Sequence, residues 1–429
     1  MVGIILGLLI LMFLAFRGWS ILWAAPIAAM VVALLNGADL LGAYTVSYMT
    51  GLAGFVQSFF PIFMLGAIFG KLMEVTGMAK SIAVKLSAWI GKEHAILAIV
   101  VSAAALTYGG ISMFVVVFAV YPIALNMFRA ANISRKIMPA TIALGGFTFT
   151  MVALPGSPQI QNLIPIDFFH TTPSAAPVMG IVAAVIMAVW GYVYLVYRQK
   201  QLAAAGEGFI EPQGGGQAQD TEETLPNFWL SLLPLAMVIA ALNAFGQHII
   251  TSLLAANLLV LALNYSKVKA FTKAINAGAS DSLIAIMNTS AAVGFGAVVR
   301  SVPAFEGLAE LLSNMPGHPL ISVGITVNLL AGATGSASGG LGIALAALGE
   351  QYHAMALEYG ISIEAFHRVA SLAAGGLDLL PHNGAVLTLL VVTGMSHRES
   401  YRDIAIATVV GPILALAAAI ALAAVFGIY

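Results

Sequence analysis

The chain repeats itself at an offset of 230 residues. Gly109-Gly110 recurs as Gly339-Gly340, and Gly145-Gly146 recurs as Gly375-Gly376, so each half carries two glycine pairs 36 positions apart. Upstream, Gly77-Met78-Ala79 aligns with Gly307-Leu308-Ala309 in the same register. One such match is weak in a chain with 43 glycines, but a shared register without gaps from residue 77 to residue 146 is not expected by chance. The chain is therefore expected to fold as two similar units.

Its composition is that of a membrane protein. Hydrophobic residues make up 60% of the 429 residues and charged residues 8%, against roughly 25% charged in soluble domains. Apolar runs recur with lengths near the roughly 20 residues that cross a bilayer: 2–16, 21–35, 51–69, 175–197, 230–245 and 404–426. No basic residue precedes the first run, so it is not a cleavable signal peptide. Two similar apolar halves interrupted by glycines are typical of secondary transporters.

We predict an all-α polytopic fold with two inverted repeats. The first repeat is residues 1–199, the second is 228–429, and the Gly- and Glu-containing stretch 200–227 is a flexible cytoplasmic linker. Each repeat is expected to contain five spans and one re-entrant helical hairpin, near 94–128 and 320–349. The predicted spans lie near 2–16, 20–38, 50–72, 137–165 and 174–197, and then near 228–245, 249–265, 281–299, 366–392 and 403–427. The alternative is that each hairpin is two ordinary spans.

The distribution of basic residues supports this topology. With the loop at Arg17 inside, 15 of the 17 Lys and Arg residues lie on the cytoplasmic side, and only Arg300 and Arg368 lie outside. Both termini are then periplasmic. Arg300 is expected to anchor the end of a span, with attraction of an anionic substrate as the alternative.

Four segments look like broken helices at membrane depth, which is tolerated only where the backbone lines a cavity or is buried in protein. Two are hairpin tips, Thr107–Ser112 and Thr334–Gly340, and two are interrupted spans, Leu154–Gln159 and Leu379–Gly384. Opened helix ends expose N–H groups whose partial positive charge suits a carboxylate. The alternative is a set of kinks in which Ser and Thr satisfy their own backbone.

Asp378 and His382 are the sharpest ionisable pair within a predicted span, where such residues are costly. Their spacing of four places both on one face of a helix, where they would take up and release a proton. The alternative is a structural pair that holds the broken helix.

Several function classes are excluded by the sequence. It has no Walker motif, no His/Glu cluster with zinc spacing, and no cysteine for a disulfide or a thiolate site. Gly335-Ser336-Ala337-Ser338-Gly339 matches G-x-S-x-G but lacks the strand-to-helix context of a hydrolase. A net charge of −1 argues against a nucleic-acid partner. No enzymatic activity, metal or cofactor is expected, apart from the coupling ion.

At its broken segments the chain resembles the gluconate permease family, within the wider ion transporter superfamily. The resemblance covers nearly the whole length and rests on the hairpin at 107–114, on 131–133, on the break at 155–161, on 335–337 and on His382-Asn383. It implies proton-coupled uptake of a small organic hydroxy acid across the bacterial inner membrane. It also implies a homodimer, in which a mobile domain carrying both hairpins moves against a scaffold in an elevator mechanism.

This chain departs from the gluconate-type pattern. Gly109-Gly110 stands where those members carry an acidic residue, and the break begins Pro155-Gly156-Ser157-Pro158 instead of His-Pro-Gly-Pro. Phe147, Phe149 and Met151 make the surroundings less polar. The pattern looks like the 3-hydroxybutyrate permease branch, so a small monocarboxylate is expected.

The sequence therefore predicts import of a short-chain hydroxy monocarboxylate with protons, Asp378 and His382 being the coupling residues. The residues expected to bind the substrate are Thr107, Tyr108, Gly109, Gly110, Ser112, Ser157, Gln159, Gln161, Asn162, Ser336, Ser338, Gly339, His382 and Asn383. Sodium coupling, gluconate or another sugar acid as substrate, an anion channel, and a receptor without flux remain as alternatives.

Overall fold

The computed structural model describes residues 2–212, 225–313 and 317–429, and in these residues the only regular secondary structure is helical. The first half contains α1 (Val2–Phe16), α2 (Ile21–Leu35), α3 (Leu40–Gly42), α4 (Met49–Val75), α5 (Met78–Ile90), α6 (Ala95–Tyr108), α7 (Met113–Ala130), α8 (Met138–Gly146), α9 (Phe149–Val152), α10 (Ile160–Phe169) and α11 (Pro177–Ala204). The second half contains α12 (Phe228–Asn243), α13 (Ile249–Leu263), α14 (Val268–Ser301), α15 (Ala304–Ser313), α16 (Pro319–Thr334), α17 (Ala337–Glu358), α18 (Ile363–Ala374), α19 (Gly384–Thr393), α20 (His397–Ala405) and α21 (Gly411–Phe426).

The two halves have the same order of elements. The pair α1–α2 corresponds to α12–α13, the long helix α4 to α14, the hairpin α6–α7 to α16–α17, and α8 and α10 to α18 and α19. Both hairpins and both interrupted spans lie close to their predicted positions, but α17 continues to Glu358, beyond the expected end at 349. Further differences are that α5 forms between the third span and the first hairpin, that α14 begins at Val268, well before the expected 281, and that α15 follows α14.

Some of these helices are long enough to cross a membrane. Within the described residues, five helical stretches pass on length and hydropathy: 40–75, 113–130, 177–204, 265–301 and 397–426. The count rises to seven if two bent pairs are each one span: α5 with the helix ending at Tyr108, bent by 102°, and α18 with α19, bent by 52°. The apolar helices α1, α2, α12, α13 and α16 are shorter, at 15 or 16 residues. The chain is therefore a multi-pass membrane protein.

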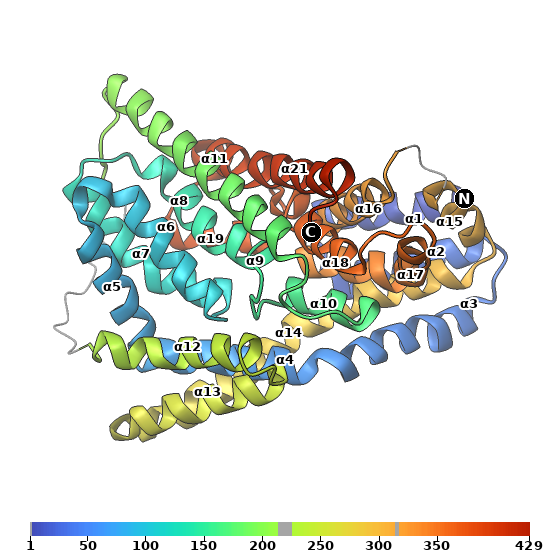
Figure 1. Ribbon diagram of the computed structural model, residues 1–429, viewed down its shortest axis with the longest axis horizontal. Coiled ribbons are helices and arrows are strands. Elements are labelled where there is room, and N and C mark those ends of the chain that lie inside the picture. Colours follow the sequence, from blue (N-terminus) through green and yellow to red (C-terminus); the bar gives the residue numbers. More distant parts are fainter. Residues whose placement is uncertain (1, 213–224, 314–316) are drawn as a thin grey trace.

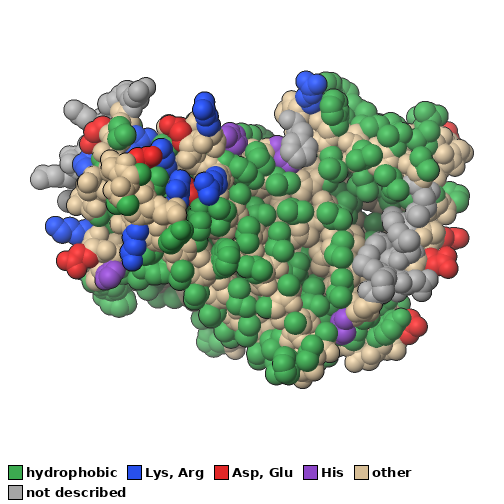
Figure 2. Space-filling view, turned by 90° about the horizontal axis from the view of Figure 1, so that it is seen from above, with side chains coloured by type: hydrophobic (Ala, Val, Ile, Leu, Met, Phe, Trp, Pro, Cys, Tyr) green, Lys and Arg blue, Asp and Glu red, His purple; other side chains and the backbone are tan. Residues whose placement is uncertain are grey.

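The surface agrees with this assignment. Hydrophobic side chains cover the broad middle of the face in Figure 2, and most of the visible Lys and Arg side chains gather at its left end. That end corresponds in Figure 1 to the region of α5, α6, α7 and the C-terminal end of α11. Lipid-facing surfaces carry few charges because burying a charge in hydrocarbon is costly.

The halves exchange their interrupted spans. One hydrophobic core joins α1, α2, α10 and α11 of the first half with α14, α17, α18 and α21 of the second half, and the other joins α4 to α8 of the first half with α12, α13 and α19 of the second half. In Figure 1, α19 accordingly lies among α6, α7 and α8, and α10 lies beside α17 and α18. The side chains of Ile62, Met113, Phe149 and Ile160 pack against both cores and so mark where the two meet.

Glycines permit the closest helix contacts. A Cβ at Gly340 would overlap the backbone of Ala331, where α17 crosses α16, and a Cβ at Gly145 would overlap the carbonyl of Val100, where α8 crosses α6. One glycine of the first half and one of the second are thus points where helix backbones touch, as is common between membrane helices.

The start of the predicted linker is tied to the loop after α7. The Arg129 guanidinium donates to both carboxylate oxygens of Glu211, at 2.7 and 2.9 Å, and Lys136 pairs with Glu207. Asn132 accepts from the backbone of Phe209 at 3.0 Å. Residues 205–212 are therefore an ordered strap, whereas 213–224 of the predicted linker lie outside the described residues.

Candidate functional site

The tip of the first hairpin docks on the first interrupted span. The Gln159 side chain donates to the carbonyl of Thr107 at 2.7 Å, and the Tyr108 hydroxyl donates to the carbonyl of Pro155 at 2.9 Å. Gly110 has a φ of +92° and faces Pro158, so a side chain there would be both strained and crowded. These contacts place residues 107–112 directly against residues 155–159.

The second hairpin tip docks on the second interrupted span in the same way. The Asn383 side chain donates to the carbonyls of Gly335 and Asp378, at 3.0 and 2.9 Å. The His382 ring lies over Gly335, where a Cβ would come 2.7 Å from its Nε2. The Ser338 hydroxyl lies 3.1 Å from that of Thr289 on α14, so this tip also rests on a long helix.

Contacts between the halves bring the two tip–break pairs together. Phe168 of α10 lies against Gly349 of α17, and His170 just after α10 lies 6.3 Å from His353, so these two helices run in the same direction. Their N-terminal ends, Ile160 and Ala337, are therefore on the same side.

The other exchanged pair has the same geometry. The guanidinium of Arg135, just after α7, donates to the carbonyl of Thr393 at the end of α19, at 2.9 Å. Because α7 and α19 also pack together, they too run in the same direction. The N-terminal ends of α7, α10, α17 and α19 thus converge, and each such end carries partial positive charge.

The four ends differ in how their N–H groups are satisfied. Ser336 accepts from the backbone N–H of Gly339 at 3.1 Å, and Asn383 accepts from those of Ala385 and Val386, at 2.6 and 3.0 Å. In contrast, Ser112 before α7 and Gln159 before α10 make no side-chain capping bond within the described part of the chain. The second half caps its own helix ends, and the first half leaves its N–H groups available to a ligand.

A buried hydrogen-bond network around Arg368, which sequence analysis did not predict, lies behind the first break. Arg368 on α18 is fully buried, although the sequence placed it on the outer side. Its guanidinium donates to the carbonyls of Ala153, Pro173 and Ala175 and to the side-chain oxygen of Asn162. These five hydrogen bonds use all five donors of an arginine, so Arg368 has none left for a substrate.

His367 belongs to the same buried hydrogen-bond network. Its ring is fully buried, with Nδ1 2.6 Å from the Thr171 hydroxyl and Nε2 3.3 Å from the side-chain oxygen of Asn162. The signal available in the sequence was a His-Arg pair flanked by apolar residues in a predicted span, where a charge needs several partners.

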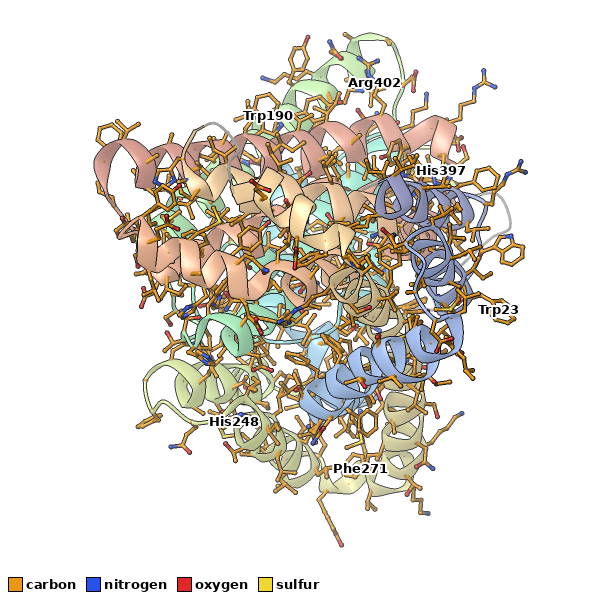
Figure 3. All side chains as sticks on the ribbon, turned by 90° about the vertical axis from the view of Figure 1, so that its right-hand side faces the viewer. Trp23, Trp190, His248, Phe271, His397 and Arg402 are labelled. Atoms are coloured by element: carbon orange, nitrogen blue, oxygen red, sulfur yellow. The ribbon has the colours of Figure 1, made fainter. Side chains whose placement is uncertain are left out.

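The spacing argument for Asp378 and His382 is wrong. The two residues are not on one helix face, because residues 377–379 form a single 3₁₀ turn and Leu380 is extended. Asp378 is 2% exposed, and its Oδ1 makes no hydrogen bond to the residues that the structure describes. His397, labelled in Figure 3, approaches the carbonyl of Pro381 at 2.9 Å and so supports the same break.

Most of the remaining predicted site residues form hydrogen bonds or packing contacts within the protein itself. Thr107 donates to the carbonyl of Gly146, Ser157 donates to that of Thr150, and Asn162 donates to those of Ser157 and Pro173. Gly109 packs against Leu235 of α12, where a Cβ would overlap the leucine side chain. Gln161 is 4% exposed, and its Oε1 has no hydrogen-bond partner in residues 2–212, 225–313 and 317–429.

A metal centre has no support in this geometry. Within the described ranges, no group of three His, Cys, Asp or Glu side chains could hold a metal ion.

An all-helical membrane fold with two interrupted spans and four converging helix ends defines the chain as a membrane permease. The comparisons with known proteins agree: a family model described as "GntP family permease" matches residues 1–250. The chain belongs to the GntP permease family.

Its relatives are named as transporters. An "Uncharacterized transporter YxjC" of Bacillus subtilis is 43% identical over 94% of both chains. Two proteins of Haemophilus influenzae are more distant. An "Uncharacterized transporter" is 26% identical over 89% of this chain and 88% of its own length, and an "Uncharacterized permease" is 25% identical over 75% and 71%.

Proposed function

We propose that this permease imports a short-chain hydroxy monocarboxylate, with 3-hydroxybutyrate as the substrate, together with protons across the bacterial inner membrane. The observation that carries the proposal is the pair of uncapped helix N-termini at α7 and α10, which lie beside each other where the first hairpin tip docks. Two such ends are a ready site for one carboxylate.

The substrate carboxylate binds at these two ends. The backbone N–H groups after Ser112 and Gln159 donate to it, and the half-buried Ser112 hydroxyl adds a further donor. Ile62, Met113, Phe149 and Ile160 line the junction between the two cores. This apolar junction suits a short aliphatic chain better than a polyhydroxylated sugar acid, whose hydroxyls would lose hydrogen bonds to water without replacement.

Proton coupling belongs to the second break. The Asp378 carboxyl group is buried, with one oxygen that has no hydrogen-bond partner among the described residues, and His382 lies two residues before α19, against the second tip. In the proposed coupling step, the Asp378 carboxyl takes up or releases a proton when the substrate anion binds or leaves.

The proposed mechanism is an elevator built on two inverted repeats. Each repeat supplies five spans and one re-entrant hairpin, both termini lie outside, and the linker 200–227 is cytoplasmic. The repeated element order and the reciprocal exchange of α10 and α19 support a two-fold relation between the halves. The homodimer and the mobile domain rest on the family resemblance.

The test is uptake of labelled 3-hydroxybutyrate into proteoliposomes, with proton and sodium gradients imposed separately. We expect accumulation with an inward proton gradient and weak competition by gluconate. Accumulation with sodium alone would overturn the coupling ion, and gluconate as the better competitor would overturn the substrate. Downhill flux without accumulation would indicate a channel.

Asp378→Asn is the matched variant for the coupling step. We expect it to abolish proton-driven accumulation while leaving counterflow exchange of substrate intact. An unchanged pH dependence of uptake would remove Asp378 from the coupling role.

A further inference from the structure

An open, almost wholly apolar groove is lined by residues of α6, α9 and α11. These three helices pack against one another behind the first hairpin (Figure 1). Its volume is about 480 Å³, within the roughly 300–1,000 Å³ of small-molecule sites. Leu97, Val101 and Ala104 of α6 form one wall, and Ala188 and Val189 of α11 form the other. Tyr108, at the hairpin tip, closes one end, and Tyr192 lies toward the other.

The corresponding face of the second hairpin is covered by the chain itself. Val327 and Ala331 of α16 stand at the positions of Leu97 and Val101, and both are fully buried. The backbone of Ala331 lies against Gly340 of α17, and α1 and α21 also pack against α16. The counterpart of α1 is α12, which packs against α5 and α13 instead and leaves this face of α6 partly exposed. This face of the second hairpin is therefore covered by other helices, whereas the equivalent face of the first hairpin carries the groove.

We propose that the groove binds the acyl chain of a membrane phospholipid. Its opening is continuous with the outward face of α11, where Val185, Val189 and Val193 are 55%, 55% and 59% exposed. This face belongs to a 28-residue apolar helix of a membrane permease, so its surroundings are hydrocarbon. Water does not fill an apolar cavity stably, whereas a lipid chain regains the dispersion contacts that an empty groove lacks.

The direction of the helices places basic residues at one end of the groove. Along α11, Gly180 lies against Pro155 and Gly191 against Leu144. On α6, Tyr108 bonds to Pro155, so α6 and α11 are antiparallel and Tyr192 lies toward the Leu97 end.

Beyond that end are Lys92, just before α6, and Lys200, near the end of α11. Both are exposed, and neither forms an ion pair with another described residue. The structure thus assigns a headgroup position that favours an anionic phospholipid, with its chain running from these lysines toward Tyr108.

The test is native mass spectrometry of the full-length, delipidated protein titrated with phosphatidylglycerol. Ala104→Phe fills the groove, and Val193→Phe places the same aromatic side chain on the exposed face of α11, at a residue that does not line the groove. We expect the wild type and V193F to retain one tightly bound phosphatidylglycerol, and A104F to bind it at least tenfold more weakly. Ala188→Phe, from the opposite wall, repeats the test if A104F does not fold.

A second arm tests the headgroup. The double variant Lys92→Gln/Lys200→Gln should weaken binding of phosphatidylglycerol several-fold and leave that of phosphatidylcholine unchanged. Equal lipid retention by the wild type and the groove-filling variants would overturn the proposal. A loss of dimer mass in A104F without a change in bound lipid would assign the groove to a second copy of the chain. Neither readout depends on transport, so the inference stands or fails separately from the proposed function.

Discussion

At the scale of single residues, Arg368 is the clearest case of a charge whose role only the structure reveals. It is enclosed by neutral oxygen acceptors, and its loss would remove five hydrogen bonds from four buried oxygens. We expect Arg368→Met to destabilise the protein by about 3 kcal/mol or more, because buried charged hydrogen bonds are costly to break.

The measurement is thermal unfolding of the purified protein in detergent. Arg300→Gln is the control, since Arg300 pairs with Glu350 at 2.6 Å but with side chains 44% and 75% exposed. Such a pair contributes about 0–1 kcal/mol. Equal shifts in the two variants would contradict a structural role for Arg368.

A single glycine of the repeated pairs can also determine how closely two helices pack. Gly340→Ala places a Cβ into the backbone of Ala331, so α16 and α17 must separate. We expect a clearly lower unfolding temperature for G340A than for Gly384→Ala, because a Cβ at Gly384 meets nothing within 4 Å. A harmless G340A would show that the hairpin packs less closely than described.

At the scale of elements, a side chain that caps its own helix is expected to contribute to stability, whereas a residue at an uncapped helix end is expected to contribute to substrate binding. Asn383→Ala removes the cap of α19 and two further bonds to carbonyls, so it should cost about 1–2 kcal/mol. Ser112→Ala removes no capping bond from the described part of the chain, so its unfolding temperature should hold while the KM for substrate rises. Thermal unfolding and uptake kinetics on the same preparations decide between these outcomes.

The strap at 205–212 makes a pH-dependent prediction. The Arg129 guanidinium beside Glu211 holds the pKa of that carboxyl below its usual range. Because the folded-state pKa is lowered, the ion pair stabilises the strap at neutral pH, and this contribution is lost as the pH falls from the unfolded-state pKa through the folded-state pKa.

Glu211→Gln should release the strap already at neutral pH. Hydrogen exchange of residues 205–212 measures this, with Glu93→Gln as an exposed control that forms no described ion pair. Protection that is insensitive to both pH and E211Q would mean that the other contacts, such as the Lys136–Glu207 pair and the backbone bond to Asn132, hold the strap.

At the scale of the whole molecule, topology is directly testable because the natural chain has no cysteine. Ala205→Cys, next to the strap, should react with a membrane-impermeant maleimide only in inside-out vesicles. Ile428→Cys, near the C-terminus, should react only in right-side-out vesicles. Labelling of both from one side would leave an even number of crossings between them and contradict the proposed inverted topology.

Hydrogen bonds also connect α11 with residues 403–406, near the end of the chain. Trp190 of α11 donates to the carbonyl of Ile406 at 2.9 Å, and Trp190 and Arg402 lie along the same upper edge in Figure 3. The Asp403 carboxylate there is nearly fully buried and accepts from Tyr194 and Arg198, at 2.5 and 3.0 Å. The last span of each half is thereby fastened to its counterpart.

The sequence by itself determined the class of protein, the two halves and the places where the helices break. Apolar runs must be helical in lipid because every backbone group needs an internal partner, and glycines mark where helices touch or open. Hence both hairpins and both interrupted spans were found near their predicted positions. These features follow from local composition and chain repetition.

Only the tertiary structure decided which polar groups are already satisfied. Asn383 and Ser336 looked like substrate ligands but cap their own helices, whereas the caps at Ser112 and Gln159 stay open. The exchange of α10 and α19 between the halves brings Arg368 to Asn162 across 206 positions of sequence. Hydrogen-bond satisfaction depends on such distant partners, and no local pattern of residues records them.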